Sequence, residues 1–430
     1  MKSALYIFLL IVLLNPLQSQ TQKEFLSLKT RYGFDVLRRP TVNFNIIPFY
    51  SGNEWLPELY LAIEIQNDRL QFIKHEDTYQ AEFQVSVVIR HDKDAFYKEN
   101  WVEKITLNNF EETNSKQIYQ YKLFKLNLTK DDQVGKLKPG KFECIFQLHD
   151  FSSENDYKSE RKFEIGENKP NVIPVSPINF VKIDDNSGYS LPFVASSNAL
   201  LYNEQYAAYA SVFLDSIHDI RINTRIYKED DEDGQLFYQK YFTLSGDSNV
   251  ADLKFDLPSD SMSPGKYSIQ FSGFSGQNEL IAEKDFEIFW FDKSTYLYKA
   301  DLAFRPMRYL LTEQKFDSVN GLSYDEKEKW MDKYWAEKDP TPHTDYNELM
   351  VVYFQRVQDA NEKFGLRNKE GWETDQGKIL LLYGEPDKIE NRIYTVNQKP
   401  HLVWIYTKYN LTFLFVDKDR DGEFTLVTEE

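Results

Sequence analysis

The sequence has almost no cysteine, and it is short of basic residues. Cys144 is the single cysteine among 430 residues, so an internal disulfide and a CxxC zinc pattern are both excluded. Lys and Arg number 51 against 68 Asp and Glu, which gives a formal net charge of −17. A nucleic-acid-binding protein needs a basic surface, so this charge balance argues against nucleic acid as a partner.

Sequence patterns of several enzyme classes are also missing. There is no P-loop, no G-x-G-x-x-G and no complete G-x-S-x-G. None of the six histidines stands two or four residues from another, which argues against a zinc-binding helix. We therefore expect no cofactor and name no catalytic residue. What is present is 41 % hydrophobic residues over a length of about three domains, enough for folded cores.

Residues 1–19 are organised like a secretory signal peptide. Lys2 precedes the apolar run Ala4–Leu14, Pro16 follows it, and Ser19 is a small residue at a cleavage position. A membrane-spanning helix needs about 20 apolar residues, and no window of this chain reaches that length. We expect cleavage, export, and a periplasmic or secreted protein of the cell envelope with no transmembrane segment.

Two later stretches resemble each other and indicate a duplicated β-domain. Lys138–Phe146 reads KPGKFECIF and Ser263–Phe271 reads SPGKYSIQF, and both continue through a Phe-Ser pair to Phe-Glu-Ile. Pro-Gly predicts a turn, and the alternation that follows predicts a strand. Cys144 stands where the second copy has Ile269, so we predict a buried, unreactive thiol.

Other alternating segments extend the β prediction over both copies. The clearest are Leu59, Leu61, Ile63 and Ile65, followed by Phe83, Val85, Val87 and Ile89. Short strands separated by turns predict two tandem immunoglobulin- or fibronectin-like β-sandwiches, at residues 29–166 and 178–291. Three prolines in Glu167–Pro177 predict a stiff linker between them.

From residue 292 to 430 the pattern predicts a compact α+β domain, with helices followed by an antiparallel sheet. Ser323 and Glu326 form a capping box before one helix, and a second helix is expected to end at Gly365. The apolar run Lys378–Tyr383 is expected to be a central strand. Further strands are expected at Leu402–Tyr406, Leu411–Val416 and Glu423–Val427.

Three short motifs in this last part occur in a distinctive order. Gly371–Asp375 (GWETD), Gly377–Ile379 (GKI) and Tyr383–Asp387 (YGEPD) together resemble the GWxTD domain family, over roughly residues 295–430. That family consists of exported bacterial proteins of uncharacterised function, so the resemblance implies export and assigns no reaction. It implies that Trp372, Thr374 and Asp375 are the family's named positions.

The motif has a structural and a functional interpretation. Thr374 and Asp375 can bond nearby backbone N–H groups, Gly371 and Gly377 suit positive φ, and Trp372 can pin the loop if its indole N–H finds a partner. The functional interpretation is a cleft beside the loop where carboxylates converge. The candidate binding residues are Trp372, Thr374, Asp375, Tyr383, Glu385 and Asp387.

The segment Asp417–Gly422 (DKDRDG) imitates the start of a calcium-binding loop. Its twelfth position is Thr428 instead of the closing Glu, and it lies between two β segments. A hairpin is therefore favoured, with Asp417, Asp419 and Asp421 as a weak metal candidate.

Together these observations favour a non-enzymatic cell-envelope protein with β-sandwich spacers and a C-terminal domain that binds a partner. The expected partner is a protein or an envelope glycan. The alternative is a hydrolase that acts on envelope glycan or peptide through carboxylates near the GWxTD loop. A purely structural stalk is the third option.

Overall fold

The structure is a computed structural model of the chain. It describes residues 26–29, 35–50, 57–92, 94–127, 137–166, 170–183, 193–214, 219–229, 234–246, 249–291, 293–342, 346–394 and 399–429. The expected signal peptide, residues 1–19, lies outside them. The chain divides into two compact units, Arg38–Phe291 and Asp292–Glu430, and Ser27–Leu37 belongs with the second. Strands β1 (Leu26–Lys29) and β2 (Asp35–Arg38) pair in a small sheet.

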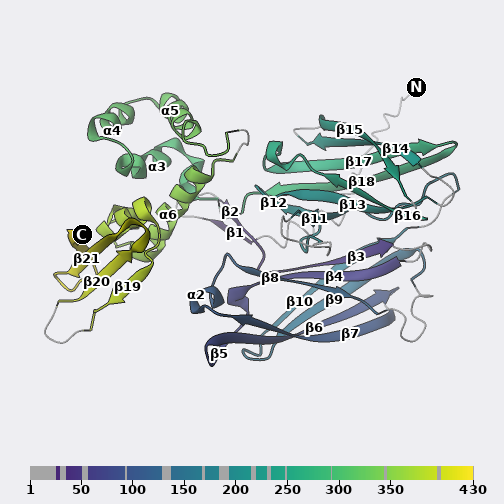
Figure 1. Cartoon of the computed structure of the whole chain (residues 1–430), viewed down its shortest axis with the longest axis horizontal. Coiled ribbons are helices and arrows are strands. Elements are labelled where there is room, and N and C mark those ends of the chain that lie inside the picture. The colour runs from purple at the N-terminus through teal and green to yellow at the C-terminus, as the bar shows by residue number, and fades with distance from the viewer. Residues whose placement is uncertain are drawn as a thin grey trace, which may run out of the picture. The chain divides into compact units, whose positions relative to one another are not determined.

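The first repeat consists of two sheets that share one core (Figure 1). The smaller has the order β3–β4–β8, and the larger has the order β10–β9–β6–β5, with β7 also paired to β6. Alternate residues of β6, from Phe83 to Ile89, are fully buried, as their period predicts. The strands are β3 (Val42–Tyr50), β4 (Pro57–Gln66), β5 (Ile73–His75), β6 (Thr78–His91), β7 (Asp94–Leu107), β8 (Tyr119–Lys125), β9 (Gly140–Asp150) and β10 (Asp156–Ile165); a short helix, α2, covers Phe110–Thr113.

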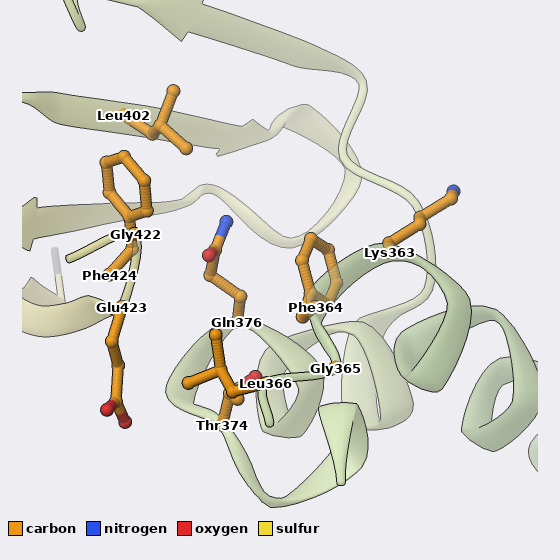
Figure 2. Close-up of a pocket in the computed structure, with 10 residues that line it drawn as sticks. All are labelled: Lys363, Phe364, Gly365, Leu366, Thr374, Gln376, Leu402, Gly422, Glu423 and Phe424. Carbon is orange, nitrogen blue, oxygen red and sulfur yellow. The ribbon is translucent and has the colours of Figure 1, made fainter. Parts of the chain in front are cut away.

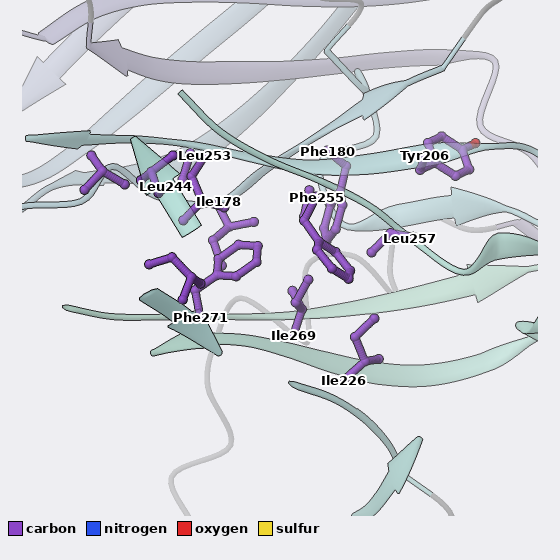
Figure 3. Packing of buried hydrophobic residues seen from close by; sticks show 14 of the residues in the cluster. Ile178, Phe180, Tyr206, Ile226, Leu244, Leu253, Phe255, Leu257, Ile269 and Phe271 are labelled. Carbon is purple, nitrogen blue, oxygen red and sulfur yellow. The ribbon is translucent and has the colours of Figure 1, made fainter. Parts of the chain in front are cut away.

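The second repeat has the same plan. Its smaller sheet is β11–β13–β16, its larger sheet is β12–β18–β17–β14–β15, and apolar side chains from both fill the core (Figure 3). Among the named strands in the described part of this repeat, only β12 runs parallel to its neighbour. The strands are β11 (Asn179–Lys182), β12 (Ala199–Leu201), β13 (Tyr206–Phe213), β14 (Asp219–Lys228), β15 (Gln235–Ser245), β16 (Val250–Asp256), β17 (Gly265–Ser275) and β18 (Asn278–Phe289).

The repeated sequence forms equivalent hairpins, β9–β10 and β17–β18. Gly140 and Gly265 begin them with φ of 153° and 149°, a region that glycine adopts readily. Cys144 and Ile269 are both fully buried at the matching position. The predicted duplication and the predicted buried thiol therefore agree with the structure.

The two repeats also pack on each other. Phe49 of the first stacks on Tyr209 of the second, with ring centroids 5.7 Å apart, and Asn45 Nδ2 donates to the Val194 carbonyl at 3.3 Å. The described part of Glu167–Pro177, where a stiff linker was expected, also pairs with the second repeat. Val172 forms a bridge with Glu279 and Val175 with Val212, because their backbone groups complete the edges of the second repeat.

The second unit begins with helices and ends in an antiparallel sheet, β19–β20–β21–β22, as predicted (Figure 1). The capping box of Ser323 and Glu326 starts α5, and α6 ends at Gly365. The elements are η5 (Thr295–Tyr298), α3 (Ala300–Phe304), η6 (Arg305–Tyr309), α4 (Glu313–Asn320), α5 (Tyr324–Ala336), α6 (Glu348–Phe364), η7 (Gly371–Glu373), α7 (Asp375–Tyr383), β19 (Lys388–Asn391), β20 (His401–Tyr406), η8 (Thr407–Tyr409), β21 (Leu411–Asp417) and β22 (Phe424–Glu429).

One expected strand is wrong. Lys378–Tyr383 belongs to helix α7, which Thr374 caps by accepting a hydrogen bond from the Gly377 N–H at 3.0 Å. Ile379, Leu380 and Leu381 are all buried, so consecutive apolar residues here reflect a helix covered on several sides. No helix in the described part of the chain has the length and apolar character needed to cross a bilayer.

Candidate functional site

The Gly371–Asp375 motif lies between α6 and α7, and its tryptophan is inside the protein. Trp372 is 1 % exposed. Its Nε1 donates to the Tyr296 hydroxyl at 3.1 Å and to Glu370 Oε2 at 2.6 Å. The same hydroxyl donates to Glu370 Oε2 at 2.5 Å and accepts from Asn361 Nδ2 at 2.9 Å. The indole N–H thus has the partner that its burial requires, and Trp372 cannot contact a ligand directly.

A cation completes this network. Arg305 donates to Glu370 Oε1 at 3.2 Å and to Glu373 Oε1 at 3.3 Å, and its guanidinium lies 5.4 Å from the Trp372 ring centroid. Burial disfavours the charged guanidinium, but the two carboxylates outweigh it and raise the Arg305 pKa. The network joins η5, η6, α6 and the motif loop, so its role is to hold these elements together.

The motif glycines allow close backbone contact. A Cβ on Gly371 would lie 1.9 Å from the Ala360 carbonyl oxygen of α6, and one on Gly377 would lie 1.9 Å from the Gly371 carbonyl oxygen. Neither glycine has positive φ, so the expectation of a left-handed conformation at these positions is wrong. Glycine is needed because no side chain fits between the loop and the two helices.

Asp375 joins helix α7 to the last strand. Its Oδ2 accepts from the Leu426 N–H of β22 at 2.8 Å. Asp375 therefore takes no part in the turn, which Thr374 and the Glu370–Glu373 capping box fix, and it instead occupies a backbone donor of an edge strand. Thr374 also donates to the Gly371 carbonyl at 2.6 Å and is buried.

The other candidate residues lie at the opposite end of α7. That helix is nine residues long, roughly 13 Å at its usual rise, and it separates Asp375 from Tyr383, Glu385 and Asp387. Glu385 forms an ion pair with Lys363, and Asp387 Oδ2 accepts from the Thr407 N–H at 2.6 Å. The structure therefore divides the six candidates into two groups, and the expected convergence of Asp375 with Glu385 and Asp387 does not occur.

Tyr383 lies in an aromatic cluster at this far end. Its ring centroid is 5.7 Å from that of Tyr406, 5.6 Å from that of Tyr409 and 5.4 Å from that of Phe413. Tyr406 donates to the Gly384 carbonyl at 2.8 Å, and burial raises its pKa. These contacts fix the end of α7 against the sheet, and Tyr383 itself is half-buried.

The metal candidate is a hairpin turn, as the sequence favoured. Asp417 Oδ1 accepts from the N–H groups of Arg420 at 2.6 Å and Asp421 at 3.2 Å, and Oδ2 accepts from that of Gly422 at 3.1 Å. Its oxygens therefore serve the backbone of the β21–β22 connection. Among the described residues, no three His, Cys, Asp or Glu side chains form a group that could hold a metal.

A cleft does lie beside the motif loop, between the start of α7, the end of α6 and the sheet. Its volume is about 260 Å³ (Figure 2). Its walls combine apolar and polar groups, and the phenyl rings of Phe364 and Phe424 lie on either side of the Gln376 side chain. The lining residues are Lys363, Phe364, Gly365, Leu366, Thr374, Gln376, Leu402, Gly422, Glu423 and Phe424.

Gln376 is the polar group at the centre of this cleft. The residue is 7 % exposed, and its amide points between the two rings (Figure 2). The amide has no hydrogen-bond partner among the residues that the structure describes. The amide oxygen and nitrogen are not among the fully buried polar atoms that lack a partner, so they reach solvent in the cleft, and a ligand that supplies a donor and an acceptor would replace water there.

The surroundings of the cleft are close to neutral. Lys363 is paired with Glu385, and Glu423 accepts from Lys369 at 2.7 Å, so each rim charge has its counter-charge. Behind Phe364 lies Trp404, with ring centroids 5.6 Å apart, and its buried Nε1 has no partner in the described structure. The cleft therefore suits a neutral ligand with an apolar group and a hydrogen-bonding group.

Sequence reasoning placed the cleft beside the loop but missed its principal residues. Phe364, Leu402 and Phe424 come from three distant segments, and only the fold brings them together. The sequence offered one usable indication of Gln376, which is a polar residue in the first turn of a helix whose second half is apolar.

Comparison with known proteins gave one family match. Residues 279–430 match the family described as the GWxTD domain. No curated protein matches the chain. A crystal structure of trypsin-activated alpha-2-macroglobulin from Escherichia coli aligns at 10 % identity over 60 % of this chain and 17 % of that one, with a TM-score of 0.19. A TM-score this low does not establish a shared fold.

Proposed function

The chain belongs to the proteins that carry a GWxTD domain, and on this basis we propose that this domain binds a partner in the cell envelope without catalysing a reaction. The observation that supports binding is the unpaired Gln376 amide between two phenyl rings in an open cleft. The arrangement resembles many ligand sites in placing a polar side chain between apolar ones in a cleft.

The ligand that fits best is an extended polypeptide segment. A peptide group offers one donor and one acceptor, which matches the two halves of the Gln376 amide. An adjacent apolar side chain would fill the space between Phe364 and Phe424. Because the rim charges are already paired, a neutral segment is favoured over an acidic glycan.

The remaining parts of the proposal concern export and architecture. Residues 1–19 are the signal peptide, and the mature protein is periplasmic or secreted. Residues 29–166 and 178–291 are immunoglobulin- or fibronectin-like spacers before the domain at 292–430. The proposal of a signal peptide is supported by a positively charged residue followed by an apolar run at the start of the sequence. The proposal of spacer domains is supported by the two-sheet plan that both repeats share.

The hydrolase alternative gains no support from the geometry. It needs two carboxylates about 5–10 Å apart around a cleft. Asp375 is bound to β22, while Glu385 and Asp387 lie beyond the other end of α7.

The binding proposal can be tested with peptides. A phage-displayed heptapeptide library is panned on the full mature chain, and the best peptide is measured by calorimetry. Gln376→Leu should weaken binding at least about tenfold, because a buried hydrogen-bond pair is lost. Val352→Ala, on an exposed part of α6 outside the cleft, is the matched control and should bind like wild type. Equal binding by a folded Gln376→Leu chain would contradict the proposal.

Export is tested separately. Expression of the whole chain in a bacterial host, followed by mass spectrometry of the envelope fraction, should show a mature N-terminus close to Gln20. An intact Met1 terminus in the cytoplasm would contradict this part and leave the cleft proposal standing.

A further inference from the structure

We propose that the outer face of the larger sheet in the second repeat binds an acidic glycan, that is, a chain of sugars bearing carboxylates. A hollow of about 690 Å³ lies on this face, and it includes Arg221, Asn223, Arg225, Tyr241, Ser272 and Phe274. Its volume is within the usual range for small-molecule sites. The inference is independent of the cleft at Gln376, which belongs to the other compact unit.

Strand register gathers these side chains. Arg221 lies opposite Phe274, Asn223 opposite Ser272, and Arg225 opposite Gln270 on the β14–β17 pair. Side chains alternate between the faces of a strand, and the intervening residues of β14 are buried in the core. The three pairs are therefore neighbours on the outer face of one rigid sheet.

The face presents aromatic rings to solvent. Tyr241 is 52 % exposed and Phe274 is 65 % exposed, although the solvent-facing side of an antiparallel sheet is commonly polar. Gln239 Nε2 donates to the Tyr241 hydroxyl at 3.0 Å, and the Arg221 guanidinium lies 4.9 Å from the Tyr241 ring centroid. The Tyr241 ring is thus held in place, and the apolar C–H face of a pyranose can stack on it at little entropic cost.

The charge of the hollow is opposite to that of the chain. Its lining has two arginines against one carboxylate, that of Glu279, whereas the whole chain has a net charge of −17. The Asn223 side-chain amide lies 3.0 Å from Arg225 Nη2, which orients that guanidinium along the sheet. Guanidinium groups bind carboxylates with two parallel hydrogen bonds, so the site selects an anionic ligand.

The neutral polar groups favour a sugar over a protein. Asn223, Gln270 and Ser272 offer amide and hydroxyl groups that can both donate to and accept from sugar hydroxyls. A stable protein interface buries about 800 Å² on each partner around an apolar centre. Here the centre is polar, and the exposed apolar side chains Tyr241, Phe274 and Ile281 are set around it.

The test is calorimetry of the full mature chain with tetragalacturonate, a carboxylated tetrasaccharide, at low salt. We expect measurable binding that weakens as salt rises. Arg221→Gln and Tyr241→Ala should each reduce affinity about tenfold or more, through loss of a charged hydrogen bond or of a stacking surface. Lys254→Gln removes one exposed positive charge from the smaller sheet of the same repeat and should change affinity less than about twofold.

Three results would overturn the proposal. They are no binding of tetragalacturonate, equal binding of the uncharged cellotetraose, and equal binding of a tetraglutamate peptide, which would indicate an acidic protein as the partner. Gln376→Leu should bind tetragalacturonate like wild type, so failure at one site is distinguishable from failure at the other.

Discussion

Arg161 and Lys284 occupy the same position in the two repeats. Each lies on the second strand of the repeated hairpin and faces the core between the two sheets of its repeat. The Arg161 guanidinium lies 5.3 Å from the Phe44 ring centroid, and Lys284 Nζ lies 5.6 Å from that of Phe180. Both duplicated domains thus retain an inward-facing cation over an aromatic ring of the opposite sheet.

This arrangement predicts how stability depends on pH. Burial, with a contribution from Arg161, lowers the Lys284 pKa to about 8, although Nζ donates to the Ile178 carbonyl at 2.9 Å. Unfolding restores an ordinary lysine pKa of about 10.4, so the unfolded state binds more protons between these values. The free energy of unfolding should therefore rise from pH 7 to 9.5, by up to about 2 kcal/mol.

Urea unfolding of wild type and Lys284→Met across this range checks the prediction. The variant removes the titrating group, so its stability should lose this rise with pH. The series stops at pH 9.5 because burial raises the pKa of tyrosines such as Tyr50 to about 12, and these destabilise the fold at higher pH. Parallel pH profiles for the two chains would contradict the assignment to Lys284.

The motif glycines give a second prediction. Gly371→Ala and Gly377→Ala should each lower the free energy of unfolding by at least about 3 kcal/mol, since the new Cβ meets rigid backbone at 1.9 Å. Gly321→Ala is the control, because its Cβ would meet only ordinary contacts at 3.7 Å. Chemical unfolding followed by tryptophan fluorescence measures all three, and a Gly371→Ala chain as stable as wild type would refute the close-approach argument.

A third prediction separates the tryptophan's structural role from binding. Trp372→Phe keeps most of the buried ring but removes the donor to Tyr296 and Glu370, so a loss of about 1–2 kcal/mol is expected. Trp372→Ala leaves a cavity and should cost about 3–5 kcal/mol. The phenylalanine variant should bind the selected heptapeptide like wild type. Lost peptide binding in a folded Trp372→Phe chain would mean that the indole itself belongs to the binding site.

The sequence predicted the elements that depend on local rules. Strand alternation, the Pro-Gly turns of the repeat and the capping box at Ser323 each rest on residues close in sequence, and each agrees with the structure. The match of Cys144 with Ile269 succeeded because a duplicated fold gives both the same surroundings. Interactions between residues close in sequence were therefore sufficient to predict these elements.

Predictions from the sequence were wrong or incomplete where the local structure depends on residues that are distant in the chain. The run Lys378–Tyr383 is apolar enough for either a buried strand or a buried helix. It forms a helix because Thr374 caps the helix N-terminus and the surrounding elements cover the helix on several sides. The sequence suggested that Gly371 is needed for a positive φ. Glycine is needed there instead because a Cβ would collide with the backbone of Ala360, eleven residues earlier on helix α6. The lining of the cleft escaped prediction for the same reason, since no local rule brings Phe364 to Phe424.

The single cysteine provides the last prediction. Cys144 is fully buried, and burial raises its thiol pKa to about 12, so almost no thiolate forms at pH 8. The folded chain should not react with a disulfide reagent such as 5,5′-dithiobis(2-nitrobenzoate) within an hour, whereas the chain in 6 M guanidinium should release one thiol equivalent. Cys144→Val keeps the apolar character but is larger by about one methyl group, so it should lower the free energy of unfolding by about 1–3 kcal/mol. Cys144→Asp places an unpaired carboxyl in the core of the first repeat and should prevent its folding. Rapid labelling of the folded chain would mean that the β9–β10 hairpin opens readily, which its shared core with β3 and β4 argues against.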